Sequence, residues 1–436
     1  MALGLYRMHS ATITAIAFAA LIALPAIAGA QETASGRAPG YKRTIPADLQ
    51  PIGTITPAGD AVSRLMERTA RGEVRLTQGH GDSYLGSVLA ALDVAVDSQL
   101  LVFSKTSVQA ARISPAQPRA IYFSDDVMVA HVPGTPGIEV VALDAARGPV
   151  FYALGERPNG PAFTPSTSCL RCHHGPNTAG VPGIYVGSVI PGPSGAPLRD
   201  DTAIITDHTT PFRDRWGGWY VTAARGEPRT RANAVAASPN DPSALVRDVP
   251  ANVRALHAFF DPRPYLAPTS DIVALLVFEH QTQLTNLLTR VAWQARVASA
   301  PGSRPAPGPG ATLADDIRSL VDYMLCVGEA PLDAPIAGVS TFAATFQARG
   351  PRDARGRSLR ELDLETRLFR YPLSYLVYSE QFRALPANLR RDVLDAVKTI
   401  LTSPPAGPRY AHLTEAVRQA TLAVARATVP DLPPGW

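Results

Sequence analysis

The sequence contains few cysteines, three in 436 residues. A disulfide framework needs more pairs, and an odd count leaves at least one thiol unpaired or otherwise used, so disulfide-rich secreted folds are excluded. An excess of one charge is also lacking, because 41 Lys and Arg residues against 37 Asp and Glu residues give a net charge of +4, and no Lys/Arg block stands out. Nucleic acid and anionic membrane surfaces are therefore poor candidates for partners.

Long hydrophobic runs are missing except at the N-terminus, where Arg7 precedes "ATITAIAFAALIALPAIAGA". Pro25 interrupts this run, and it closes on the small residues Ala28 and Ala30, a pattern typical of a cleaved secretory signal. An uncleaved anchor is the alternative, disfavoured because the run is short and lacks stop-transfer charges. We predict that residues 1–30 are a signal peptide, that the protein is exported to the periplasm, and that no integral membrane segment remains after cleavage.

Composition divides the rest of the chain into three parts. Residues 31–56 are rich in Pro and Gly and predict an extended segment, residues 57–235 contain mainly short β-branched and aromatic runs, and residues 236–436 show helical periodicity. A polar break, "AASPNDPS", separates the last two, and a Pro/Gly linker interrupts the helical part at 299–312. We predict an α+β protein with a β-rich N-terminal domain and a mainly α-helical C-terminal domain.

Individual elements follow from the same patterns. The runs "LLVFSK", "AIYFSDDVMVAHV", "IEVVALD", "PVFYALG", "GIYVGSVI", "AIITDH" and "WGGWYVTA" predict strands of an antiparallel or mixed sheet. Helices are predicted at Pro57–Arg71 with Thr56 as N-cap, Asp271–Ala298 with Ser270 as N-cap, Leu313–Val327, Pro372–Arg383, Asn388–Leu401 and Leu413–Ala427.

The stretch "STSCLRCHHGPN" holds Cys169 and Cys172, followed at once by His173. It matches CxxCH, the signature of c-type haem attachment. Two residues between the thiols let both sulfurs add to the two vinyl groups on one porphyrin edge, and the imidazole of His173 then reaches the iron. With three Cys and nine His in 436 positions, a chance match is expected in roughly four of ten thousand such sequences. We predict one covalent haem c in a loop between two strands.

Two other uses of the cysteine pair remain open. A zinc site needs two further close Cys or His ligands, and the sequence has no second CxxC or HxxxH pair. A thioredoxin-like redox pair belongs at a strand-to-helix junction, whereas Pro176 and Asn177 soon follow this motif. The neighbouring His174 cannot reach the opposite ring face from His173 and is predicted to lie in the second shell or in solvent.

The sixth iron position has two histidine candidates. His280 lies on the apolar stripe of the predicted helix that begins at Asp271, and a buried imidazole needs a partner, either iron or a hydrogen-bonding group of the core. His208 ends a strand in "IITDHTTPF", where turn hydrogen bonds are the alternative role. The thioethers of Met128 and Met324 are more typical of core filling.

Several other side chains have weaker functional interpretations. The aromatic residues Trp216, Trp219 and Tyr220 either contact the porphyrin or pack in the sheet. The cations Arg213 and Arg215 are candidates to pair with a haem propionate. The third cysteine, Cys326, is predicted to be a buried, inert thiol.

Segments such as "TAGVPGIYVGSV", "TDHTTPFRDRWGGWYVT", "FEHQTQLTNLLTR" and "FRYPLSYLVYSEQFRALP" resemble a family of exported bacterial single-haem c-type cytochrome-like proteins that has no assigned reaction. The resemblance spans most of residues 84–400 and implies haem and export. It carries the haem residues onto Cys169, Cys172 and His173 and the HQ pair onto His280 and Gln281, and His208 also fits. After the WGGWY run, Ala and Arg stand where relatives have His and Met, which puts in doubt any ligand proposed within 223–235.

These observations predict a protein of periplasmic electron transfer with one haem c. The alternative is a haem enzyme, oxidase- or peroxidase-like, or a small-molecule or redox sensor with an open or labile sixth iron position. A binding module with an incidental CxxC is a third class and requires that haem be absent. The expected partner is a redox protein or a small-molecule acceptor, and the position of the motif among strands suggests a PAS-like haem domain.

Overall fold

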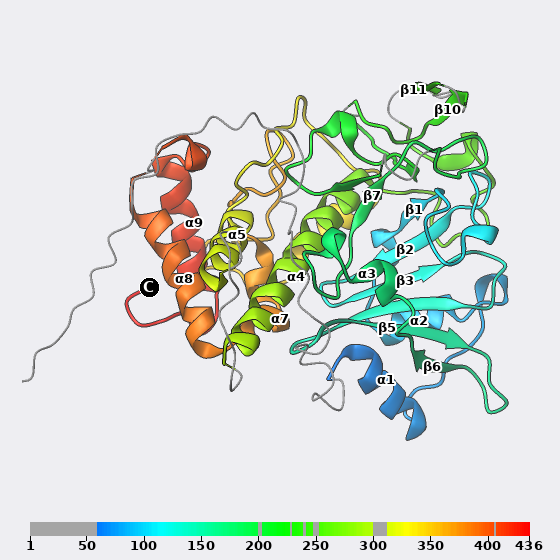
Figure 1. Ribbon diagram of the computed structural model, residues 1–436, viewed down its shortest axis with the longest axis horizontal. Helices are drawn as coiled ribbons and strands as arrows, with labels where there is room; N and C mark the ends of the chain where they lie inside the picture. The colour runs from blue at the N-terminus through cyan, green and yellow to red at the C-terminus, as the bar shows by residue number, and fades with distance from the viewer. Residues whose placement is uncertain are drawn as a thin grey trace, which may run out of the picture. The chain divides into compact units, whose positions relative to one another are not determined.

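The computed structural model describes residues 59–198, 203–226, 229–238, 241–246, 253–299, 312–404 and 407–436, with the backbone alone for 241–244. The predicted signal peptide, the predicted extended segment and nearly all of the predicted linker lie outside these residues. The described residues all belong to one compact unit, Gly36–Trp436. They confirm an α+β protein with a β-rich region followed by a helical region (Figure 1).

Within the described residues, a seven-stranded antiparallel sheet has the order β6-β5-β4-β3-β2-β1-β9. Its strands are β1 Leu100–Val102, β2 Arg119–Phe123, β3 Val127–His131, β4 Ile138–Asp144, β5 Gly148–Gly155, β6 Ala162–Pro165 and β9 Trp219–Tyr220. Six consecutive strands form a meander, and β9 returns from later in the chain to pair with β1. Two separate hairpins pair β7 Val186–Ser188 with β8 Ile204–Thr206 and β10 Val235–Ser238 with β11 Asp241–Val246.

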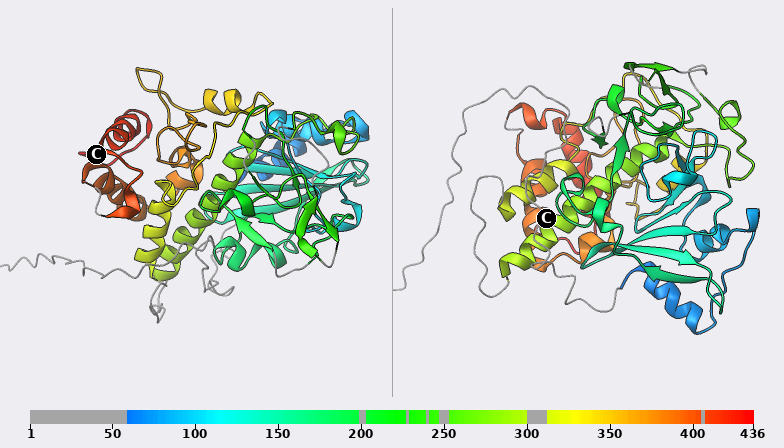
Figure 2. Two further views of the ribbon diagram at one scale, coloured as in Figure 1. Left: turned by 90° about the horizontal axis from the view of Figure 1, so that it is seen from above. Right: turned by 45° about the vertical axis from the view of Figure 1, so that its right-hand side comes forward.

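The sheet is apolar on both faces, as expected when both are covered. One face packs with α1 Ala61–Ala70 and α2 Leu85–Ala91 in a hydrophobic cluster. The other face shares a larger cluster with α4 Ile272–Ser299 and the C-terminal helices. Figure 2 shows α4 between the sheet and the C-terminal helices, so this one helix joins the two regions.

The remaining helices are short or lie in the C-terminal region. They are α3 Leu170–His173, α5 Leu313–Met324, α6 Phe342–Ala348, α7 Glu380–Arg383, α8 Ala387–Thr402 and α9 Glu415–Thr428. Single 3-10 turns are His80–Asp82, Val96–Ser98, Ala110–Arg112, Pro176–Thr178, Phe212–Asp214, Leu256–Ala258, Tyr375–Tyr378 and Pro408–Tyr410. No described helix is long and apolar enough to cross a membrane.

Helix starts differ from the prediction where a nearby carboxylate captures the free N–H groups. The first helix begins at Ala61 rather than Pro57, because Asp60 Oδ1 accepts from the N–H of Val62 at 2.8 Å. In α4, Asp271 Oδ1 accepts from the N–H of Val273 at 2.8 Å. Ser270, predicted as the cap of α4, instead accepts a hydrogen bond from the sheet.

Other segments also differ from the prediction. The helix predicted over 372–383 is a 3-10 turn followed by the single turn of α7, because Ser374 and Ser379 each cap a separate short piece. The described residues of the polar break, 236–238 and 241–243, lie in strands β10 and β11. The sequence patterns gave no indication of α2, α6 or β6.

Candidate functional site

The CxxCH segment forms the one-turn helix α3 between β6 and β7, with Cys169 at its N-cap. Cys172 is exposed and Cys169 partly exposed, and in the described structure neither is in a disulfide. Cys169 Sγ lies 3.4 Å from Ser166 Oγ. Both thiols are therefore accessible, and a single helical turn places them close together on one side of the segment.

His173 is held in one tautomer by the backbone that follows it. Its Nδ1 lies 2.9 Å from the carbonyl oxygen of Gly183, and because that oxygen can only accept, Nδ1 carries the proton. The N–H of Gly183 donates in return to the carbonyl oxygen of His173 at 2.9 Å. Among the described residues, no group forms a hydrogen bond with Nε2. A protonated Nδ1 with a free Nε2 is the arrangement of a metal-ligating histidine.

The surroundings of His173 favour its neutral form. Burial lowers the pKa of the imidazole, and the hydrogen bond to Gly183 opposes this shift only partly. The ring packs between Phe151, at 5.0 Å between centroids, and Tyr185, at 5.4 Å. A neutral imidazole keeps its Nε2 lone pair available to a metal.

A cleft of about 320 Å³ adjoins the CxxCH segment and is lined by Cys169, Cys172 and His173. One wall is the sheet face that bears Val102, Ile121, Met128, Ala130, Val141 and Phe151. The other wall comes from the segment after the motif and from β7 and β8, with Ile184, Tyr185, Gly187, Val189, Ala203 and Ile205. Most of these side chains are apolar, so the cleft suits a flat hydrophobic group.

Few charges enter this apolar lining. Arg119 of β2 and Glu139 of β4 form an ion pair across the intervening strand β3, and Arg171 of α3 also lines the cleft. Guanidinium groups at the edge of an apolar cleft are suited to carboxylates such as haem propionates. In the part of the chain that the structure describes, no group of three or more His, Cys, Asp and Glu side chains is arranged to hold a metal ion by itself.

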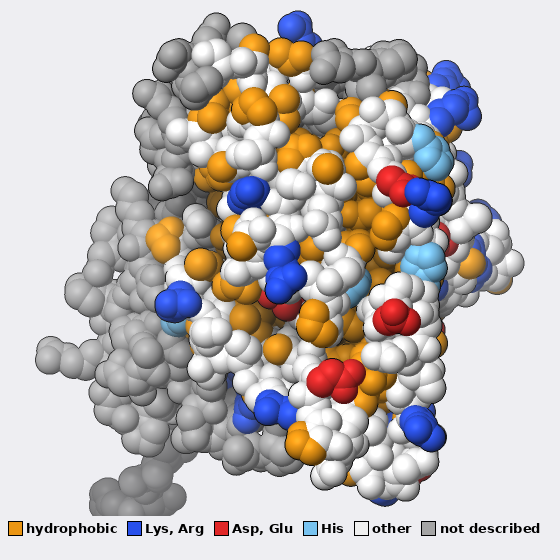
Figure 3. All heavy atoms as spheres, turned by 90° about the vertical axis from the view of Figure 1, so that its right-hand side faces the viewer, with side chains coloured by type: hydrophobic (Ala, Val, Ile, Leu, Met, Phe, Trp, Pro, Cys, Tyr) orange, Lys and Arg blue, Asp and Glu red, His pale blue; other side chains and the backbone are white. Residues whose placement is uncertain are grey.

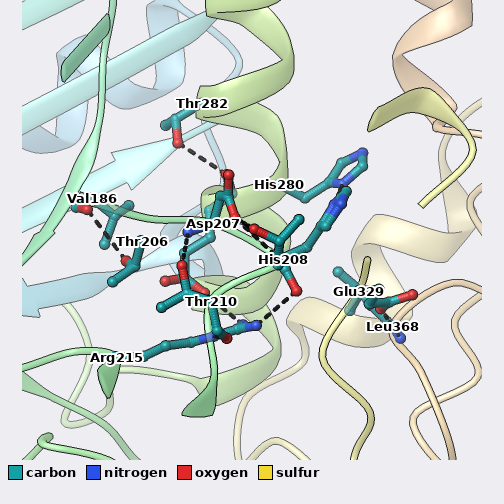
Figure 4. A network of polar contacts seen from close by, with 12 residues as sticks. Val186, Thr206, Asp207, His208, Thr210, Arg215, His280, Thr282, Glu329 and Leu368 are labelled. Atoms are coloured by element: carbon teal, nitrogen blue, oxygen red, sulfur yellow. Dashed lines mark hydrogen bonds and ion pairs between the residues drawn. The ribbon is translucent and has the colours of Figure 1, made fainter. Parts of the chain in front are cut away.

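His208 and His280 are brought together, but neither lines the cleft. Their Nδ1 atoms lie 2.9 Å apart, and His280 Nε2 lies 2.7 Å from Ser374 Oγ, so both nitrogens of His280 have partners inside the protein. Figure 4 shows the two rings pointing toward one another. Burial lowers the pKa of His208 to about 3 and that of His280 well below its usual value. Their role as iron ligands stays a prediction.

A buried ionic network lies next to this histidine pair. Arg215 pairs with Glu279 at 3.1 Å and donates to the carbonyl oxygens of Thr210 and His208 (Figure 4). Burial raises the pKa of Glu279 to about 7, against the opposing effect of the Arg215 charge. Arg215 thus has buried partners of its own, whereas Arg213 is exposed.

No family model, no curated protein and no solved structure matches this chain. Of the other candidates, Trp219 and Met128 line the cleft, whereas Trp216, Tyr220 and Met324 do not. Cys326 is fully buried, and burial raises the pKa of its thiol.

Sequence patterns had not singled out Phe151, Arg119, Glu139 or Arg171 as cleft residues. A signal was present for the ion pair, because Arg119 and Glu139 are charged residues that stand next to apolar ones in their strands. A charge at an inward position of a strand indicates a polar partner or a ligand.

Proposed function

We propose that this protein is an exported c-type haem protein that transfers single electrons in the periplasm. One haem would be held covalently by Cys169 and Cys172, with His173 as an iron ligand. The observation that carries this proposal is that these three residues line one apolar cleft, with Nδ1 of His173 engaged by the backbone and Nε2 without a hydrogen-bond partner among the described residues.

The residues present fit a haem in three respects. Two unpaired, accessible thiols supply the two thioether bonds that c-type attachment requires. The cleft, at about 320 Å³, falls within the range of roughly 300 to 1,000 Å³ typical of ligand and cofactor sites. Because a porphyrin brings four nitrogen ligands of its own, the protein needs to supply only one or two more, and His173 offers one at the cleft.

When bound, the haem supplies an iron centre that gains and loses one electron. The protein's residues would fix its orientation through the two sulfurs, hold His173 in a single tautomer and exclude water with the sheet face. Arg119 and Arg171 would pair with the propionates. The sheet that faces the motif also supports the proposed likeness to a PAS-like haem domain.

A second function is favoured by the position of the predicted sixth ligands. Among the described residues that line the cleft, His173 is the one imidazole and Met128 the one thioether, whereas His208 and His280 contact each other. If Met128 does not bind iron, the sixth position is open or labile. The protein would then be a haem enzyme, oxidase- or peroxidase-like, or a small-molecule or redox sensor.

The partner would be a redox protein or a small-molecule acceptor. On the face drawn in Figure 3, hydrophobic side chains lie between scattered positive and negative ones, and neither sign forms a continuous field there. Val108, at the cleft, is 72% exposed. An apolar contact near the cleft, rather than strong charge steering, is the expected basis of docking.

The test is to express the full chain with haem-attachment machinery and stain the denatured protein for covalent haem. Stain on the chain, together with an unresponsive low-spin spectrum in the presence of CO, is the result expected for electron transfer. CO binding to the reduced protein would favour the enzyme or sensor. A mature chain whose mass includes no added tetrapyrrole would overturn both.

A further inference from the structure

A single peptide group connects His173 to helix α4. Its carbonyl oxygen, that of Gly183, accepts the proton of His173 Nδ1 at 2.9 Å. Its N–H, that of Ile184, donates to Asn286 Oδ1 at 2.9 Å. Asn286 Nδ2 completes the pair by donating to the carbonyl oxygen of Ile184 at 2.7 Å.

This connection is buried and closely packed. Asn286 is fully buried on α4, and a Cβ atom added at Gly183 would lie 2.3 Å from Asn286 Oδ1. Arg290, one helical turn further along, donates to the carbonyl oxygen of Ala179 at 2.8 Å and pairs with Asp316. Helix α4 therefore hydrogen-bonds to the segment after the motif through Arg290 and Asn286, and the contact of Asn286 continues through one peptide group to the histidine.

Hydrogen bonds in such a series polarise one another. When the N–H of a peptide donates to an acceptor, its carbonyl oxygen becomes a stronger acceptor, by about 10–30% per bond. A stronger acceptor at Nδ1 makes the imidazole a more electron-rich ligand at Nε2, which stabilises the oxidised metal. Asn286 thus acts on Nε2 of His173 without touching it.

We propose that Asn286 is a positioning residue that sets the ligand strength of His173 through the Gly183–Ile184 peptide, and thereby the reduction potential of the iron. The proposal rests on the proposed function and assigns control of that site to a residue of the helical region. It gives α4 a role in tuning the cofactor in addition to packing.

The test compares Asn286→Ala with Thr289→Ala in the haem-loaded full chain. Thr289 is a matched control because it is buried on the same helix, and its hydroxyl donates to the carbonyl oxygen of Thr285 and accepts from Gln381, away from the His173 segment. In Asn286→Ala the reduction potential is expected to rise, and the proton resonance of His173 Nδ1–H in the reduced protein is expected to shift toward that of a weaker hydrogen bond. Thr289→Ala is expected to lower the unfolding temperature without either change.

Asn286→Asp is a second variant that covers the case in which Asn286→Ala fails to fold. It retains an acceptor for the N–H of Ile184, so the potential is expected at or below the wild-type value and the Nδ1–H resonance is expected to shift toward a stronger bond. If haem is attached but the potential and the resonance are the same in wild type and Asn286→Asp, or move equally in Asn286→Ala and Thr289→Ala, the inference fails and the proposed function stands. If wild type carries no covalent haem, the proposed function fails and the inference with it.

Discussion

The three cysteines differ in environment, and this difference makes the proposed haem attachment testable residue by residue. Cys172 is exposed at the cleft, whereas Cys326 is buried and does not line it. We expect Cys172→Ser to keep haem attached through Cys169 alone, with one vinyl group left unsaturated. The α band of the pyridine haemochrome should then move to longer wavelength, because one more vinyl stays conjugated to the ring.

Cys326→Ser is the control for this experiment, because it also removes one thiol from the chain. Its haemochrome spectrum should equal that of wild type. A Cys172→Ser protein with an unshifted band would show that Cys172 forms no thioether.

Asp126, in the turn between β2 and β3, makes the free energy of unfolding depend on pH. Burial, followed by the negative charges of Asp125 and Glu380, raises its pKa to about 6, and the cations Arg64 and Arg360 oppose the shift. Because the folded pKa lies above the unfolded value, this contribution to stability is full below the unfolded pKa and is lost as pH rises through about 6.

We therefore expect Asp126→Asn to gain stability relative to wild type between pH 5 and pH 8. The gain is at most about 1.4 kcal/mol, because one pKa unit corresponds to about that free energy. Urea unfolding of both proteins at the two pH values measures it. An equal difference at pH 5 and pH 8 would contradict the expectation.

At the residue scale, the sequence predicted what depends on local spacing and missed what depends on packing. Cys169, Cys172 and His173 are adjacent in the chain, so their pattern alone points to haem attachment. His208 and His280 are 72 positions apart in the chain. The burial of His280 could be predicted from the apolar stripe on which it lies. That they contact each other rather than the cleft depends on how β8 and α4 pack, which no local pattern encodes.

At the scale of elements, the β4–β5 turn docks closely on helix α4. Gly148 has a positive φ of 80°, and a Cβ atom there would lie 2.5 Å from Thr289 Cγ2. Gly72, after α1, has a similar φ of 73° but no atom within 4 Å of the same Cβ position. A substitution at Gly72 therefore strains the backbone alone, whereas a substitution at Gly148 strains the backbone and also crowds Thr289.

We expect Gly72→Ala to cost about 1 kcal/mol of unfolding free energy, from the left-handed backbone alone. Gly148→Ala should cost more, by roughly 1–3 kcal/mol, since it also forces the turn away from α4. Chemical denaturation measures both costs, and Thr289→Ala in the Gly148→Ala background should recover part of the difference. Equal costs at the two glycines would show that the turn can move away from α4 without loss.

Element types were predictable where periodicity is long, and element ends were not. The apolar period gave α4, α5, α8 and α9 close to their observed bounds. The N-terminal ends depended on which side chain reaches the free N–H groups, and Asp271 does so in α4 while Ser270 bonds to the sheet. The choice between two adjacent capping residues is made by tertiary contacts.

At the scale of the whole molecule, the ranges predicted as separate domains, 57–235 and 236–436, share one hydrophobic cluster. It includes Met128 and Trp219 of the sheet together with Phe278 of α4 and residues of α8 and α9. Phe123 of β2 contacts the ring of Phe278 at 4.9 Å between centroids. A core that is continuous across the predicted boundary couples the folding of both ranges.

We therefore expect residues 31–235, expressed without 236–436, not to form the native sheet. Removal of α4 would expose the apolar sheet face and leave the backbone of Ile184 without Asn286, so both the core and the support of His173 would be lost. The fragment should show no cooperative thermal transition, whereas the full chain should unfold in a single one with calorimetric and van't Hoff enthalpies equal. Should the fragment give a dispersed NMR spectrum and the haem spectrum of the full chain, the sheet region would be an independent domain, and the control of His173 by α4 would have to be secondary.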